Sequence, residues 1–128
     1  MAQYADIVEI VAPGEAVGGN RVDITIRIKN NYSSTIGIMA GGALEYGVSP
    51  WPNINFPEPS ANVDGEATRS FNGYFTMPGK KVTIHAYSYY YGADGSWHFD
   101  DEMTKTIDIA EEIESQFGSI EILSYSRR

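Results

Sequence analysis

The segment from Lys80 to Ile109 contains two long runs of strand-forming residues on either side of a short turn, Gly92–Gly95. In the first run Val82 and Ile84 fall on one face and His85 falls on the other. This period of two predicts a strand with one buried side. The glycines of the turn tolerate the positive φ that a short hairpin connection requires. The sequence therefore predicts a long β-hairpin, which any fold of this chain must accommodate.

Similar alternation recurs along the rest of the chain. The strongest strand patterns cover Tyr4 to Val11, Asn20 to Asn30 and Ala67 to Met77. Residues from Thr35 to Val48 predict two short strands with a bulge or kink at the Gly-Gly pair between them. The segment from Ser49 to Ser60 holds four prolines, which cannot donate to a sheet ladder, so we expect a crossover loop there.

Together with the hairpin, these patterns give about seven strands, with turn signals about every eight to twelve residues. That spacing predicts an all-β, immunoglobulin-like antiparallel β-sandwich rather than a fold of alternating strands and helices. The length of 128 residues suits one domain. We expect the sandwich to occupy residues 1–110.

Residues 111–128 break the pattern and are predicted to form a C-terminal tail. Three glutamates between Ala110 and Gln116 are compatible with a short helical turn or with an acidic linker. The run from Ser119 to Tyr125 then predicts an appended strand, with Ile120 and Ile122 as its apolar anchors. Such a strand can pair with the parent sheet or with the edge of a neighbouring subunit.

Composition limits the classes of partner. The formal net charge is −8 and only nine residues are Lys or Arg, which argues against binding to nucleic-acid phosphates. No stretch approaches the roughly 18 apolar residues of a membrane span, and the start lacks the pattern of a secretory signal. We therefore expect a soluble product made in the cytoplasm, although a processed fragment of a longer secreted chain would look the same. Cysteine is absent, which excludes disulfides and thiolate chemistry.

Chemistry-bearing residues are sparse. His85 and His98 lie on the two arms of the hairpin, and their alternation predicts that both project from the same outer face. Together with Asp100 they could hold a metal, but ordinary cross-strand pairing on a wet sheet face is the interpretation that we favour. Asp100 and Asp101 are expected to point to opposite faces of their strand, which makes them a poor acid–base pair.

The other acidic residues and the glycines also fail to form a known catalytic or binding motif. The acidic stretches lack the residue spacing of a calcium-binding loop, so we read them as solvated edges. No nucleophile elbow or phosphate-binding glycine loop is present. We expect no cofactor, no bound metal and no enzymatic activity.

Aromatic residues are the remaining functional signal. Tyr87, Tyr89 and Tyr91 are predicted to form a row on the outer sheet face, where tyrosines serve as a sugar platform, a protein contact or cross-strand stabilisers. Trp97 and Phe99 are expected to cap the core from the other arm of the hairpin. In the proline-rich loop, aromatic residues including Trp51 either pin the loop to the body or face a partner.

Several segments together resemble a known family. They are A-D-I-V-E-I-V-A-P-G-E at Ala5 to Glu15, V-D-I-T-I-R-I-K-N ending at Asn30, F-T-M-P-G-K-K-V-T-I-H-A-Y-S-Y-Y at Phe75 to Tyr90, and D-G-S-W-H-F-D-D-E in the hairpin. The chain from Ala5 to Ala110 resembles the bacterial cell-adhesion-related, immunoglobulin-like sandwich domains, especially versions found in bacteriophage and archaeal-virus structural proteins. The resemblance implies an accessory or adhesive module on a virion or cell surface, and it carries over no catalytic residue.

We therefore expect a non-enzymatic structural or accessory subunit of a multi-copy assembly, namely a virion accessory protein such as a capsid decoration or tail component. Such a protein would be made in the host cytoplasm and would contact copies of itself or other structural subunits, with no nucleic acid or membrane as partner. The first alternative is a carbohydrate-binding or adhesion module at a cell surface, with a glycan as partner. A metal-assisted hydrolase built on His85, His98 and Asp100 is the second. The candidate interface residues are Tyr87, Tyr89, Tyr91, Trp51, Ile120 and Ile122.

Overall fold

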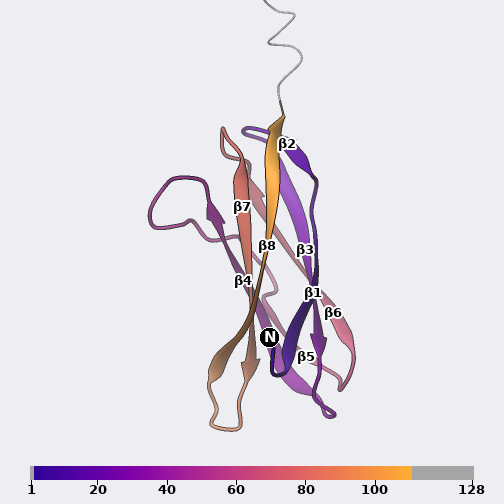
Figure 1. Ribbon diagram of the computed structural model, residues 1–128. Coiled ribbons are helices and arrows are strands. Elements are labelled where there is room, and N and C mark those ends of the chain that lie inside the picture. Colours follow the sequence, from indigo (N-terminus) through magenta and orange to yellow (C-terminus); the bar gives the residue numbers. More distant parts are fainter. Residues whose placement is uncertain (1, 111–128) are drawn as a thin grey trace, which may run out of the picture.

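A computed structural model describes residues 2–110, which form eight strands and two facing sheets (Figure 1). The strands are β1 (Ala5–Val11), β2 (Glu15–Val17), β3 (Arg21–Asn30), β4 (Ile36–Glu45), β5 (Ser60–Val63), β6 (Thr68–Thr76), β7 (Val82–Tyr91) and β8 (Trp97–Ala110). The predicted all-β sandwich is confirmed, and the predicted hairpin is β7 and β8, which lie side by side in Figure 1.

One sheet has the strand order β1-β3-β6 and the other has the order β2-β8-β7-β4-β5. Neighbouring strands are antiparallel except at one edge, where β2 runs parallel to the end of β8. The sequence indicated only a turn at Ala12–Glu15, and β5 was not predicted either. Both strands have three or four residues, too few for a recognisable period of two.

The core lies between the two sheets and is built from the alternating residues of the long strands. Ile26 and Ile28 of β3 and Val82 and Ile84 of β7 belong to this core, and each of these side chains is fully buried. Their polar neighbours in the sequence point outward, as the alternation predicted.

β4 is one continuous strand, so the prediction of two short strands interrupted at Gly41 and Gly42 is wrong. A Cβ atom on Gly42 would lie 2.8 Å from Cδ1 of Ile54, which packs against this point from the proline-rich loop. The glycine therefore makes room for a neighbouring segment and does not break the strand.

The proline-rich loop closes one open side of the sandwich. The amide of Leu44 donates to the carbonyl of Pro52, and the amide of Ile54 donates to the carbonyl of Gly42, which ties the loop to β4. Asn55 and Tyr74 exchange backbone hydrogen bonds, which ties the same loop to β6 in the other sheet. The segment is a loop as predicted, but it is not a crossover, because it joins β4 to β5, its antiparallel neighbour in the same sheet. It contacts the other sheet through Asn55.

Side chains of β7 and β8 close the opposite side by binding the free edge of β1. The carboxylate of Asp100 accepts hydrogen bonds of 2.7 to 2.8 Å from the amides of Gln3, Tyr4 and Ala5. Asp101 accepts one of 3.0 Å from the amide of Ile7. In addition, the Ser88 hydroxyl donates to the carbonyl of Ala5. These bonds occupy backbone groups of an edge strand that would otherwise be unpaired.

Asp100 and Asp101 thus point to the same side, which corrects the expectation that they face opposite ways. The reason is a β-bulge, because Asp101 lies opposite Ser88 while Phe99 lies opposite Tyr89, and Asp100 is the extra residue between them.

The predicted tail, with its acidic linker or helical turn and its appended strand carrying Ile120 and Ile122, lies outside the described residues. Whether the domain ends at residue 110 stays a prediction. Within residues 2–110 no helix is long and apolar enough to cross a membrane.

Candidate functional site

Five aromatic side chains form a row along the outer face of the five-stranded sheet. Phe99 lies between two tyrosines, with its ring centroid 6.1 Å from that of Tyr87 and 5.9 Å from that of Tyr89. Closer to the turn, the rings of Tyr91 and Trp97 are 5.2 Å apart. Phe99 is 57% exposed, Tyr91 47% and Trp97 38%. We call these five residues the aromatic row.

The bulge at Asp100 explains why Trp97 and Phe99 belong to this row, although we expected them to cap the core. Counting back from buried Ile107 in steps of two places Phe99 and Trp97 on the inner face. One extra residue reverses the faces for everything that precedes it in the strand. The signal in the sequence is the run of three successive acidic residues, 100–102, which interrupts the alternation.

Small residues of β4 lie beside the row. Gly41 is paired with Tyr87, and a Cβ atom at Gly41 would lie 3.5 Å from the ring of Tyr89. Burial raises the pKa of the Tyr87 hydroxyl, and the charge of Glu102 raises it further. The Tyr87 phenol is therefore neutral at physiological pH.

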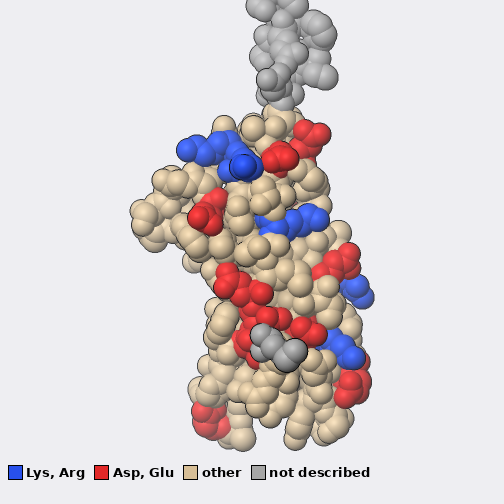
Figure 2. All heavy atoms as spheres, viewed as in Figure 1, with Lys and Arg blue, Asp and Glu red and all other residues tan. Residues whose placement is uncertain are grey.

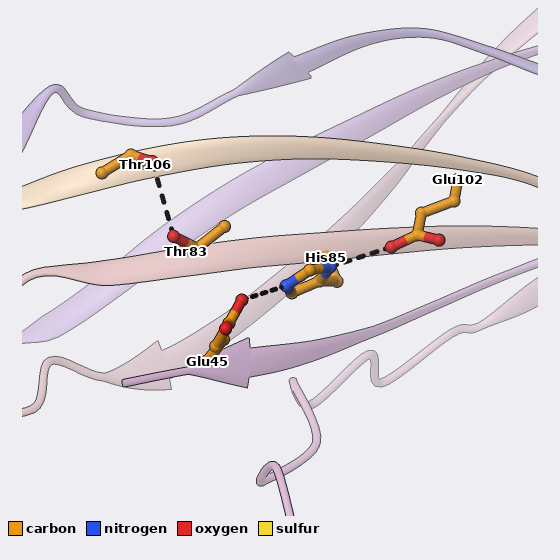
Figure 3. A network of polar contacts seen from close by, with 5 residues as sticks. All are labelled: Glu45, Thr83, His85, Glu102 and Thr106. Carbon is orange, nitrogen blue, oxygen red and sulfur yellow. Dashed lines mark hydrogen bonds and ion pairs between the residues drawn. The ribbon is translucent and has the colours of Figure 1, made fainter. Parts of the chain in front are cut away.

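His85 lies on the same face, held between two carboxylates (Figure 3). Its Nε2 atom is 2.8 Å from Oε1 of Glu45, and its Nδ1 atom is 2.8 Å from Oε2 of Glu102. Trp51 covers the imidazole, with ring centroids 4.3 Å apart and planes 22° apart, and the His85 side chain is only 12% exposed. Burial lowers the pKa of His85, but the hydrogen bonds and charges of both carboxylates outweigh it, so the pKa is raised overall.

His98 lies on the opposite face of the sheet, which contradicts the prediction that the two histidines share one face. Its ring stacks on Tyr90 at 5.2 Å, and its Nε2 atom is 3.0 Å from the carboxylate of Asp94. The bulge at Asp100 is again the cause. Since Asp100 binds the backbone of β1, the three proposed metal ligands are not brought together. No group of three or more potential metal ligands occurs in the described part of the chain.

The candidate interface residues therefore separate into groups. Tyr87, Tyr89 and Tyr91 lie on the outer face as predicted, next to the two aromatic residues that the prediction had placed in the core. Trp51 is 41% exposed and stacks on His85 rather than on a ring of the row. Ile120 and Ile122 lie outside the described residues.

Comparison with known proteins gives the fold alone. No family model matches the chain, and no curated protein matches it by sequence. Among solved structures, the CARDB domain of the PF1109 protein from Pyrococcus furiosus, in complex with di-metal ions, is similar with a TM-score of 0.59 and 9% identity, covering 86% of this chain and 92% of that one.

Two larger enzymes contain similar domains. The alkylpurine DNA glycosylase AlkC of Pseudomonas fluorescens has a TM-score of 0.61 at 8% identity, covering 84% of this chain and 31% of that one. A cycloisomaltooligosaccharide glucanotransferase of Paenibacillus sp. has a TM-score of 0.56 at 18% identity, covering 88% of this chain and 15% of that one. The chain thus spans less than a third of either enzyme. The fold is an immunoglobulin-like β-sandwich, shared with a cell-adhesion-related domain.

Proposed function

We propose that the protein is a non-enzymatic accessory subunit of a multi-copy assembly, and that copies of the chain meet through the aromatic row. The observation that carries this proposal is the row of five aromatic rings on one sheet face, of which Phe99, Tyr91 and Trp97 are exposed and the other two are half-buried. Tyr, Trp and Phe are enriched at protein interfaces, whereas charged residues are depleted from interface centres. Large rings with few rotatable bonds also lose little entropy when they are buried.

Charge supports the choice of a second copy as the occupant. Two chains of net charge −8 repel each other, so their contact is least costly where charge is absent. Figure 2 shows acidic side chains gathered near the middle of the visible face, an acidic group at the hairpin end on the left, and further acidic and basic side chains along the right-hand side of that end. The aromatic row begins at Tyr87, which lies opposite Glu102, and ends at the pair of Tyr91 and Trp97 beside the turn.

The state of His85 supports a non-enzymatic role. Both of its ring nitrogens contact carboxylates. His85 therefore has no nitrogen left to move a proton to or from a substrate.

The finer proposal is that the assembly is a virion, in which the chain is a capsid decoration or tail component made in the host cytoplasm. Its support is the resemblance of Ala5 to Ala110 to the sandwich domains of phage and archaeal-virus structural proteins. Gold-labelled antibody against the chain should decorate particles isolated from cultures of the source organism. Label confined to the cell surface would favour the adhesion alternative instead.

Cysteine cross-linking tests the proposed contact, because the chain contains no cysteine of its own. We expect a short bis-maleimide to join copies that carry Thr104→Cys, because Thr104 is exposed on the same sheet face beside the aromatic row and its replacement leaves the row intact. Ser70→Cys is the matched control, because Ser70 is exposed on the outer face of the other sheet, and this variant should not form cross-linked dimers. Equal cross-linking of both variants, or of neither, would contradict the proposal.

The second candidate is a carbohydrate-binding or adhesion module in which Tyr87, Tyr89, Tyr91 and Trp51 act as stacking platforms. The exposure of Tyr91 and Trp51 favours it. In that case Tyr89→Ala would abolish glycan binding and leave the mass of the protein unchanged.

A further inference from the structure

A hollow of about 650 Å³ opens at the hairpin end of the sandwich, away from the centre of the aromatic row. It lies between the start of β1, the connection from β3 to β4, and the β7–β8 turn. Pockets for small ligands range over roughly 300–1,000 Å³ and combine apolar walls with a few fixed polar groups. This hollow has the size and the composition of such a pocket.

Tyrosines form its walls and are fixed in place by one another. The ring of Tyr4 is nearly perpendicular to that of Tyr32, with centroids 5.3 Å apart, and to that of Tyr90, with centroids 4.9 Å apart. His98 stacks on Tyr90, and Tyr91 completes the lining. These contacts exist without a ligand, so binding would require little side-chain ordering.

Polar groups enter the same space. The hydrogen bond from His98 lowers the pKa of Asp94, and the bond from Ser96 lowers it further, so the Asp94 carboxylate is ionised at neutral pH. The side-chain amide of Asn62 enters from β5. Tyrosine hydroxyls, a carboxylate, an imidazole and an amide together offer both donors and acceptors.

A second groove of about 370 Å³ adjoins the hollow and shares Gly37, Asn62 and Tyr91 with it. Trp97 lines this groove. A Cβ atom on Gly37 would lie 3.1 Å from Cβ of Tyr91 and 3.3 Å from Cη2 of Trp97. A side chain at this position would therefore crowd Tyr91 and Trp97, which line the groove.

We propose that the hollow and its adjoining groove bind the end of a neutral oligosaccharide. A sugar unit presents apolar C–H faces and a ring of hydroxyls, which match aromatic walls that carry several donors and acceptors. Of the described residues that line the two spaces, none is Lys or Arg, which argues against an anionic ligand. The one carboxylate is already paired with His98, so a cation would gain little from it.

Trp97 provides the readout. The chain has two tryptophans, so Trp51→Phe leaves Trp97 as the sole tryptophan, beside the proposed site. We would titrate this protein with cellotetraose, maltotetraose, mannotetraose and chitotetraose. We expect at least one of them to change the Trp97 emission saturably. Adding Asn62→Ala should weaken that binding by about tenfold, the equivalent of one lost hydrogen bond.

Two further variants make the test specific. Gly37→Val should abolish binding, because its side chain would displace Tyr91 and Trp97 from the wall of the groove. Asn72→Ala, on the outer face of the other sheet, should leave the affinity unchanged. Thermal melting would confirm that each variant is folded. No saturable response to any of the four sugars would overturn the proposal, and so would saturation by tetramethylammonium alone.

This site overlaps the hairpin end of the proposed assembly contact, because Tyr91 and Trp97 belong to both, whereas Phe99 lines neither the hollow nor the groove. Phe99→Ser should prevent self-association and leave sugar binding intact, whereas Asn62→Ala should do the reverse. The two proposals can therefore fail separately.

Discussion

Phe99 lies directly opposite Tyr89 across the β7–β8 hairpin, with ring centroids 5.9 Å apart and planes at 73°. This pairing depends on Asp100, the extra residue of the bulge that follows. The bulge turns Phe99 outward onto the aromatic row and directs the Asp100 carboxylate toward the backbone of β1. One inserted residue thus creates both the candidate contact face and a closing bond of the sandwich.

Asp100→Ala should lower the free energy of unfolding by about 1–3 kcal/mol, because the buried amide of Ala5 and its neighbours would lose their acceptor. Urea denaturation followed by circular dichroism measures this loss. Asp100→Asn retains a carbonyl oxygen that can accept, so its loss should be smaller.

Asp108→Ala is the control for this prediction, since Asp108 is an exposed acid on the same strand. It should change the stability by no more than about 0.5 kcal/mol. Equal effects of Asp100→Ala and Asp108→Ala would show that the bonds to β1 contribute no stability.

Asn30→Ala should destabilise the protein by about 2–4 kcal/mol. The Asn30 side chain is fully buried, and its Nδ2 atom donates to the carbonyls of Ser34 and Val63, each at 2.9 Å. Its Oδ1 atom accepts from the amide of Tyr32 at 2.8 Å. Truncation leaves several of these groups buried without a partner.

Thermal and urea unfolding of Asn31→Ala provide the comparison for Asn30→Ala. The bond of Asn31 to Tyr4 uses its backbone amide, which the substitution retains. We expect a change within about 0.5 kcal/mol. If Asn30→Ala lowered the free energy of unfolding as little as Asn31→Ala does, the hydrogen bonds of the Asn30 side chain would not be needed for stability, and the prediction would be wrong.

The bonds of His85 should make stability depend on pH. Because the pKa of His85 is raised in the folded state, the charged ring is favoured by folding. This stabilisation is fully present below the pKa of an unfolded histidine, about 6.5, and is lost as the pH rises through the folded-state pKa. The difference in stability between the wild type and Glu102→Gln should therefore be larger near about pH 6 than near about pH 8.5.

Proton NMR of the His85 ring follows the same effect directly. Its titration midpoint should fall in Glu102→Gln and in Glu45→Gln, because each substitution removes one carboxylate. A midpoint that does not move in either variant would refute the assigned cause.

Alternation in the sequence was sufficient to predict the long strands, because a buried face imposes the period of two on each of them. It predicted Val82 and Ile84 as core residues and Tyr87 and Tyr89 as outer residues. It failed where long-range contacts decide the structure. β2 pairs with a segment about 90 positions away, and Gly42 is explained only by Ile54 packing from the loop.

The candidate site was predicted in part for the same reason. A period of two fixes a face only as long as no residue is inserted, so counting through Asp100 placed His98, Trp97 and Phe99 on the wrong side. The hollow at the hairpin end was not predicted at all. It gathers Tyr4, Tyr32 and Tyr90 from three distant segments, and no local pattern links them.

Light scattering behind size-exclusion chromatography, over a series of protein concentrations, tests the proposed assembly most directly. We predict that the wild-type mass rises above that of one chain as the concentration increases, and that Phe99→Ser stays at the mass of one chain. Phe99 is 57% exposed, so replacing it should not disturb the core. A wild-type mass of one chain at every concentration, or an unchanged multimer in Phe99→Ser, would contradict assembly through the aromatic row.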